Sequence, residues 1–157
     1  MNIKHIWSVL CRESLINKDD NVISLNGVLE QLTVGLKPDR DGKLPEKVNI
    51  PINYEIVSFW IKEVDYTEEA KADIEIKLLE PGGKKIIGII KKMIIPKNIK
   101  RFRSRMKIAG LTISKEGDYI FQVSKKEENE KNFNLVSELP LEVKIVLNKP
   151  LERKIVN

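Results

Sequence analysis

Hydrophobic and polar residues alternate along most of the chain, in runs rich in β-branched residues that short polar segments separate. A period of two places successive side chains on opposite faces of a strand, whereas an amphipathic helix needs apolar residues three and four positions apart. Residues 65–73 (DYTEEAKAD) are the best candidate for a short helical turn. The pattern therefore predicts an all-β fold of about eight or nine strands.

Turn-forming residues divide the chain at several points, since Gly, Pro, Asn and Asp favour turns. Asn26-Gly27 forms either a hairpin turn or a bulge in one long strand, and we favour the bulge because 17–21 already provides a turn. The expected strands cover about 3–15, 22–34, 50–64, 72–80, 84–95, 100–114, 119–123, 133–139 and 141–147, followed by a frayed tail from 148 to 157. Long strands with tight turns favour an antiparallel β-sandwich with Greek-key connections, immunoglobulin-like or close to it.

The clearest hairpin joins residues 72–80 to 84–95 through Pro81-Gly82-Gly83, because glycine tolerates the positive φ that such turns require. With a two-residue loop and a bulge near Gly88, Glu75 would lie opposite Lys91. Opposite charges at directly paired positions stabilise a sheet.

Length and composition are typical of one soluble domain spanning residues 1–157, with 41% hydrophobic and 32% charged residues. The apolar run from Ile6 to Cys11 is too short for a signal peptide, and no stretch approaches the ~20 apolar residues of a membrane helix. The single cysteine excludes an internal disulfide and fits a reducing compartment. We therefore expect a cytoplasmic protein without membrane association.

Charge is distributed unevenly along the chain. The segment 82–115 carries eleven Lys and Arg residues and no Asp or Glu, and the rest of the chain has 17 basic and 23 acidic residues. Within 100–108 the cations alternate with other residues, so one face of this strand becomes a cationic stripe with about 6–7 Å between successive charges. The candidate anion-binding residues are Lys91, Lys92, Arg101, Arg103, Arg105 and Lys107.

Three interpretations of this stripe remain open. It could bind nucleic acid or another polyanion, whose phosphates repeat on a similar scale. It could equally be a solvated face, or an edge strand that Lys and Arg protect from aggregation. A protein partner with an acidic surface is the third interpretation. Aromatic residues that could stack on bases are not evident on the stripe, which weakens the case for single-strand binding.

Catalytic and metal-binding signatures are not found in the sequence. The single His5 and the single Cys11 cannot form a dyad within one strand, and they are too few for a zinc site. Asp39-Arg40-Asp41-Gly42 resembles only a fragment of a calcium loop, although Asp19, Asp20, Asp39 and Asp41 could cluster at one end of a sandwich. A hydrolase or calcium-dependent binder is therefore the weakest hypothesis, and we expect no enzyme and no cofactor.

Two resemblances concern the fold. Gly117 to Val123 (GDYIFQV) resembles the Gly-x-Tyr-x-Phe-x-Val strand of immunoglobulin-like sandwiches, which implies that the Tyr119 hydroxyl binds backbone near residues 113–116. The segments 23–29 (ISLNGVL), 108–113 (IAGLTI) and 138–143 (ELPLEV), in this order, resemble an uncharacterised family of small prokaryotic β-sandwich proteins. That resemblance implies a single sandwich domain and supplies no activity.

These observations together favour a non-enzymatic module for protein interaction or oligomerisation that uses sheet edges or the charged hairpin. The alternative is polyanion or nucleic-acid binding through the basic face of residues 84–107. Trp7, Phe59 and Trp60 are expected to fill the core, and Cys11 is expected to be a small core residue.

Overall fold

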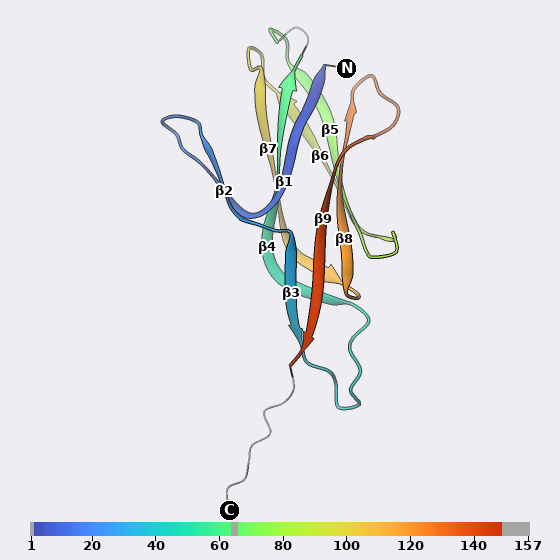
Figure 1. Cartoon of the computed structure of the whole chain (residues 1–157). Helices are drawn as coiled ribbons and strands as arrows, with labels where there is room; N and C mark the ends of the chain where they lie inside the picture. Colours follow the sequence, from blue (N-terminus) through green and yellow to red (C-terminus); the bar gives the residue numbers. More distant parts are fainter. Residues whose placement is uncertain (1, 64–65, 149–157) are drawn as a thin grey trace, which may run out of the picture.

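The computed structural model describes residues 2–63 and 66–148 (Figure 1). Its elements are β1 (Ile3–Ile16), β2 (Ile23–Val28), β3 (Gln31–Leu36), β4 (Val48–Lys62), β5 (Ala70–Leu79), β6 (Lys85–Ile95), β7 (Arg101–Ile113), β8 (Gly117–Glu127) and β9 (Asn134–Leu147). Within these residues the all-β prediction is confirmed. The prediction of a helical turn at 65–73 is wrong for the described residues, because 66–68 form a simple turn and β5 starts at Ala70. Asp65 and the predicted frayed tail beyond residue 148 lie outside the described residues.

The strands form two sheets, one with the order β2-β1-β4-β7 and the other with the order β3-β9-β8-β5-β6. All pairs are antiparallel except β3 with β9, which run parallel from Gln31 opposite Glu142 to Leu36 opposite Leu147. The expectation of a wholly antiparallel fold is therefore wrong at this pair. The chain crosses between the sheets at residues 29–30, so the expected long strand 22–34 is two strands, one in each sheet.

Proline 140 is accommodated inside β9, where two separate strands were expected. Pro140 pairs with Ile120 of β8 on one side, whereas pairing with β3 on the other side begins only at Glu142. Proline has no N–H to donate, and a position with one unpaired side tolerates this loss.

One hydrophobic core is shared by the two sheets. Ile56 and Trp60 of β4 and Ile74 of β5 are fully buried in it, and the ring of Tyr54 lies 5.7 Å from that of Phe121 in the other sheet. Each buried apolar side chain of this size contributes about 1.5–3 kcal/mol relative to an exposed one. The core is therefore the main stabilising contribution.

The predictions for four individual core residues have different outcomes. Trp60 and Cys11 are fully buried, as expected. Trp7 and Phe59 are only partly buried, and their ring centroids lie 5.8 Å apart. Phe59 follows Ser58 and precedes Trp60, so strand alternation places it on the face of the sheet opposite to the core.

The hydroxyl of Tyr119 closes the turn between β7 and β8. It accepts hydrogen bonds from the backbone N–H of Ser114 (2.9 Å) and Lys115 (3.2 Å) and donates one to the carbonyl of Lys115 (2.8 Å). The expected backbone contact near residues 113–116 is confirmed.

The register of the β5–β6 hairpin differs from the prediction. The irregularity lies at the turn end, where Leu79 pairs with Lys85 and Leu78 with Ile87, rather than near Gly88. As a result Glu75 lies opposite Ile90 instead of Lys91, and its ion-pair partner is Lys77 of its own strand, at 3.1 Å.

The first residues of the chain are fastened to the end of β8. The carboxylate of Glu127 accepts hydrogen bonds from the backbone N–H of Asn2 (2.8 Å) and Ile3 (3.1 Å), and Lys125 pairs with this carboxylate and donates to the carbonyl of Ile3 (2.7 Å). These interactions satisfy charges that are otherwise costly to bury. They connect the N-terminal strand of one sheet to the other sheet.

Candidate interaction surface

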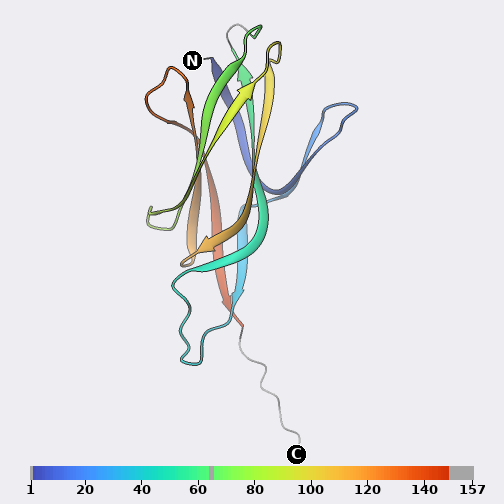
Figure 2. The same ribbon diagram turned by 180° about the vertical axis from the view of Figure 1, so that it is seen from behind.

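Strand β7 forms one edge of the first sheet, and β6 forms an edge of the second. The turn between them brings the two strands together at the top of both ribbon views (Figures 1 and 2). Among the described residues, β7 pairs only with β4. The unpaired N–H and C=O groups of an edge strand are a template for another strand.

The four cations of β7 project from one face of this sheet, as the alternation predicts. Their partners on β4 are Ile61 for Arg101, Phe59 for Arg103, Val57 for Arg105 and Glu55 for Lys107. The intervening Phe102 and Met106 are directed to the other face, where they pack against or within the core. The fold therefore places these four cations on one face of β7, as a continuous charged stripe.

The two candidate lysines of β6 do not join this stripe. Lys92 pairs with Asp73 and Lys91 with Ile74, so successive side chains are directed to opposite faces of the second sheet. The structure thus brings together Arg101, Arg103, Arg105 and Lys107 and leaves Lys91 and Lys92 on the neighbouring edge.

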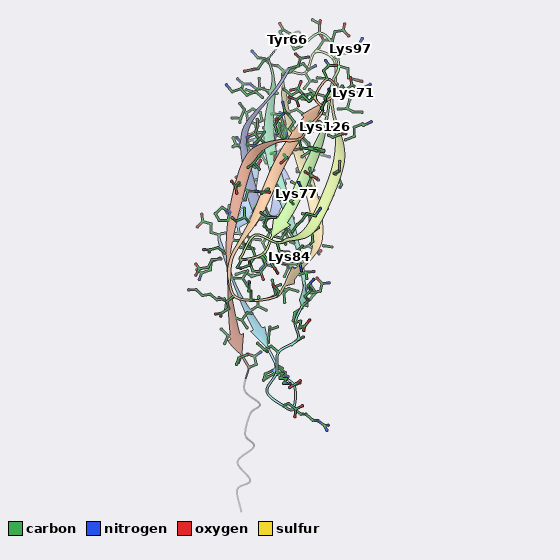
Figure 3. All side chains as sticks on the ribbon, turned by 90° about the vertical axis from the view of Figure 1, so that its right-hand side faces the viewer. Tyr66, Lys71, Lys77, Lys84, Lys97 and Lys126 are labelled. Atoms are coloured by element: carbon green, nitrogen blue, oxygen red, sulfur yellow. The ribbon has the colours of Figure 1, made fainter. Side chains whose placement is uncertain are left out.

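The lysines of β5 and β8 differ from the cations of β7 in their acidic neighbours. On the second sheet Lys77 pairs with Glu75 at 3.1 Å, Lys126 with Asp73 at 3.7 Å and Lys71 with Glu69 at 3.3 Å. Figure 3 labels these three lysines. By contrast, the four cations of β7 form no ion pair with any residue that the structure describes.

Two of these arginines hold the β1–β2 hairpin, which stands out from the body of the molecule (Figure 1). The guanidinium of Arg103 donates to the carbonyl of Asn21 (2.8 Å), and that of Arg105 donates to the carbonyl of Ser14 (3.3 Å). Beyond Cys11, strand β1 leaves β4 and pairs with β2 alone. The contacts from β7 therefore position the hairpin over the outer face of the first sheet.

A groove of about 630 Å³ lies between the hairpin tip and the ends of β4 and β7. Its walls combine apolar side chains from both sides with two guanidinium groups at the β7 edge. The lining residues that define this groove are Ile16, Val22, Ile23, Phe59, Arg101 and Arg103, together with Asp20, Asn21 and Phe102. Val22 and Leu15 of the hairpin are 55% and 52% exposed. Such a combination suits a segment that is partly apolar and partly acidic.

A partly buried polar network that the sequence did not predict connects β1 and β4 of the first sheet. The Nε2 atom of His5 is 2.7 Å from Oγ of Ser8, which is 2.6 Å from Oγ of Ser58. Residues three apart on a regular strand are directed to opposite faces, but the register of β1 against β4 shifts between His5 and Trp7. Burial lowers the pKa of His5.

Cys11 and Glu55 are paired neighbours on β1 and β4, and both are buried. Burial raises the pKa of the Cys11 thiol, and the nearby charge of Glu55 raises it further. A thiol with a raised pKa is a poor nucleophile. This agrees with the interpretation of Cys11 as a core residue.

The four aspartates that could have formed a calcium site act in separate turns. Asp20 accepts a hydrogen bond from the N–H of Val22 at the hairpin tip, whereas Asp39 accepts from the N–H groups of Asp41 and Lys43 in the loop between β3 and β4. These loops lie apart in Figure 1, and the described residues contain no group of three potential metal ligands. The four aspartates therefore do not gather at one end.

Comparisons with known proteins define no family for this chain. No protein-family model matches the sequence, and no curated protein matches it. A solved structure, "Crystal structure of the C-terminal domain of wzt", is similar with a TM-score of 0.49 and 9% sequence identity, covering 91% of this chain and 74% of that one. The described part of the chain contains no helix that is long and apolar enough to cross a membrane.

Proposed function

We propose that this protein is a single cytoplasmic β-sandwich domain that acts as a non-enzymatic protein-interaction module. The shared core of the two sheets supports the sandwich, and the chain crosses between sheets after β2, β3, β4, β6 and β7, as in Greek-key and immunoglobulin-like folds. The Tyr119 corner is a further feature of such folds. We also propose membership of the uncharacterised family of small prokaryotic β-sandwich proteins that the sequence resembles.

The observation that carries the proposed function is the groove beside β7. It places apolar side chains, two arginines and a free strand edge within one surface. Aromatic residues and arginine dominate the binding energy of many protein interfaces. A partner segment in this groove would cover Phe59 and the inner side of the hairpin.

A photo-cross-linking amino acid at Val22 tests this proposal in cells of the native host. Val22 is exposed and lines the groove, so the variant should yield a specific adduct with a partner protein. The matched control carries the same amino acid at Leu135, which is 50% exposed on the second sheet. The Val22 adduct should decrease when Arg101→Glu is added. Identical adducts from both positions would contradict the proposal.

The stripe on β7 also favours a second candidate function, polyanion binding. Arg101, Arg103, Arg105 and Lys107 share one face with a spacing of about 6–7 Å. Affinity for labelled DNA or RNA should then fall steeply with salt, because each phosphate contact releases counterions. Affinity that is unchanged in Arg101→Ala would exclude this function for the stripe.

A further inference from the structure

We infer that the partner segment is an extended strand that pairs with the free edge of β7 and carries acidic residues at alternate positions. This inference rests on the proposed function and specifies its partner. It follows from the backbone of β7, from its two faces and from the composition of the other edge strands.

The backbone of β7 can accept another strand. Its hydrogen-bonded partner β4 runs beside it from Ile61 opposite Arg101 to Val48 opposite Ile113. On the other side, no described strand pairs with it. Strand addition to such an edge provides affinity through main-chain hydrogen bonds and specificity through alternate side chains.

The side chains of β7 determine which residues the added strand should carry. Directly opposed side chains on paired strands lie about 4.5–5.5 Å apart, close enough for ion pairs. On the outer face an added strand meets Arg101, Arg103 and Arg105, which favours carboxylates. On the inner face it meets Phe102 and Ile108, which are partly buried against the core and favour apolar residues. An alternation of acidic and apolar residues matches both faces.

A second copy of this chain is a poor source of such a strand. In the part of the chain that the structure describes, the other three edge strands are β2 (ISLNGV), β3 (QLTVGL) and β6 (KIIGIIKKMII), and none of them contains Asp or Glu. Pairing β7 with any of them would place its cations opposite neutral residues or other cations. Like charges at opposed positions destabilise a sheet, so the partner is a different protein.

Peptide binding tests this inference with purified full-length protein. The probe is a fluorescent peptide of about nine residues in which Glu and Val alternate, long enough to span Arg101 to Lys107. One control peptide has the same composition with its Glu residues in one block. A second control alternates in the same way but carries an N-methyl group on every peptide nitrogen, which removes all main-chain donors.

Charge-reversal variants locate the binding site. The double variant Arg101→Glu/Lys107→Glu alters two exposed cations, and neither of them holds the hairpin among the described contacts. Lys71→Glu/Lys77→Glu makes the same change in net charge on the second sheet. The alternating peptide should bind the wild type, lose about tenfold in affinity with the β7 variant and remain within about twofold with the control variant.

Several results would overturn the inference. Equal binding of the blocked or N-methylated peptide would mean charge attraction without strand pairing. A DNA oligonucleotide that displaces the peptide and binds more tightly would favour a polyanion ligand. Absence of peptide binding while Val22 still cross-links a partner would overturn the strand inference alone. Absence of both would remove the proposed function as well.

Discussion

The hydroxyl of Tyr119 shows how far a single residue can be interpreted from sequence. The resemblance of Gly117 to Val123 to a strand of immunoglobulin-like sandwiches implied the backbone contact, and all of its partners lie within five residues. The His5–Ser8–Ser58 network could not be predicted in the same way. It depends on a register shift in β1 and on a residue of β4 that is 50 positions away from Ser8.

Removal of the Tyr119 hydroxyl should reduce stability measurably. Tyr119→Phe leaves two N–H groups without their acceptor and one carbonyl without its donor, at a cost of about 1–3 kcal/mol. Urea denaturation measures the change in the free energy of unfolding. Tyr54→Phe is the matched control, because the Tyr54 hydroxyl donates one described hydrogen bond, to the carbonyl of Gly110. Loss of this hydrogen bond should cost about 0.5–1.5 kcal/mol. Equal losses in the two variants would contradict this account.

The pKa of His5 implies a pH dependence of stability. Burial lowers this pKa below 6.5, so the unfolded state binds more protons than the folded state near that pH. The contribution of His5 to the free energy of unfolding is fully present above pH 6.5 and is lost as the pH falls through the folded-state pKa. The free energy of unfolding changes by at most about 1.4 kcal/mol per pH unit. Denaturation at several pH values should show this loss in the wild type. His5→Gln should flatten it, and an unchanged slope would exclude His5 as the source.

At the scale of elements, most strand positions follow from local alternation, whereas sheet membership does not. Strand β7 was expected from its own sequence, and its cations share one face as predicted. The division of 22–34 into β2 and β3 was not predicted, because Leu29 and Glu30 include no Gly, Pro, Asn or Asp to indicate a break. The groove was also not predictable, since it depends on how far the hairpin stands from β4 and β7.

The hairpin should loosen when its contacts with β7 are removed. Arg103→Met/Arg105→Met keeps the long apolar side chains but deletes the donors to Asn21 and Ser14. Amide hydrogen exchange in β2 should become faster, while protection of the central strands β5 and β8 should change little, because hairpins open locally. Lys107→Met serves as the control without a described hairpin contact. Uniform acceleration in all strands would instead indicate global destabilisation.

At the scale of the whole molecule, the uneven charge of the sequence concentrates positive charge on one side of the fold. The basic segment forms β6, β7 and the turn between them, so its cations gather along two neighbouring sheet edges. The sequence alone indicated the excess charge but not its compensation. Lys71 and Lys77 have acidic partners two residues away in the sequence, whereas only the folded register places Asp73 of β5 beside Lys126 of β8.

The parallel pairing of β3 with β9 has a consequence for how the chain folds as it is synthesised. Strand β3 is complete at Leu36, yet the strand that hydrogen-bonds to it begins at Asn134. The carboxylate that fastens residues 2 and 3 belongs to Glu127 and is likewise translated late. Contacts between such distant segments carry a large loop-closure entropy and slow folding. On the ribosome, β3 and residues 2 and 3 therefore remain without their partners until almost the whole described sequence has emerged. The two sheets pack against each other as a late step.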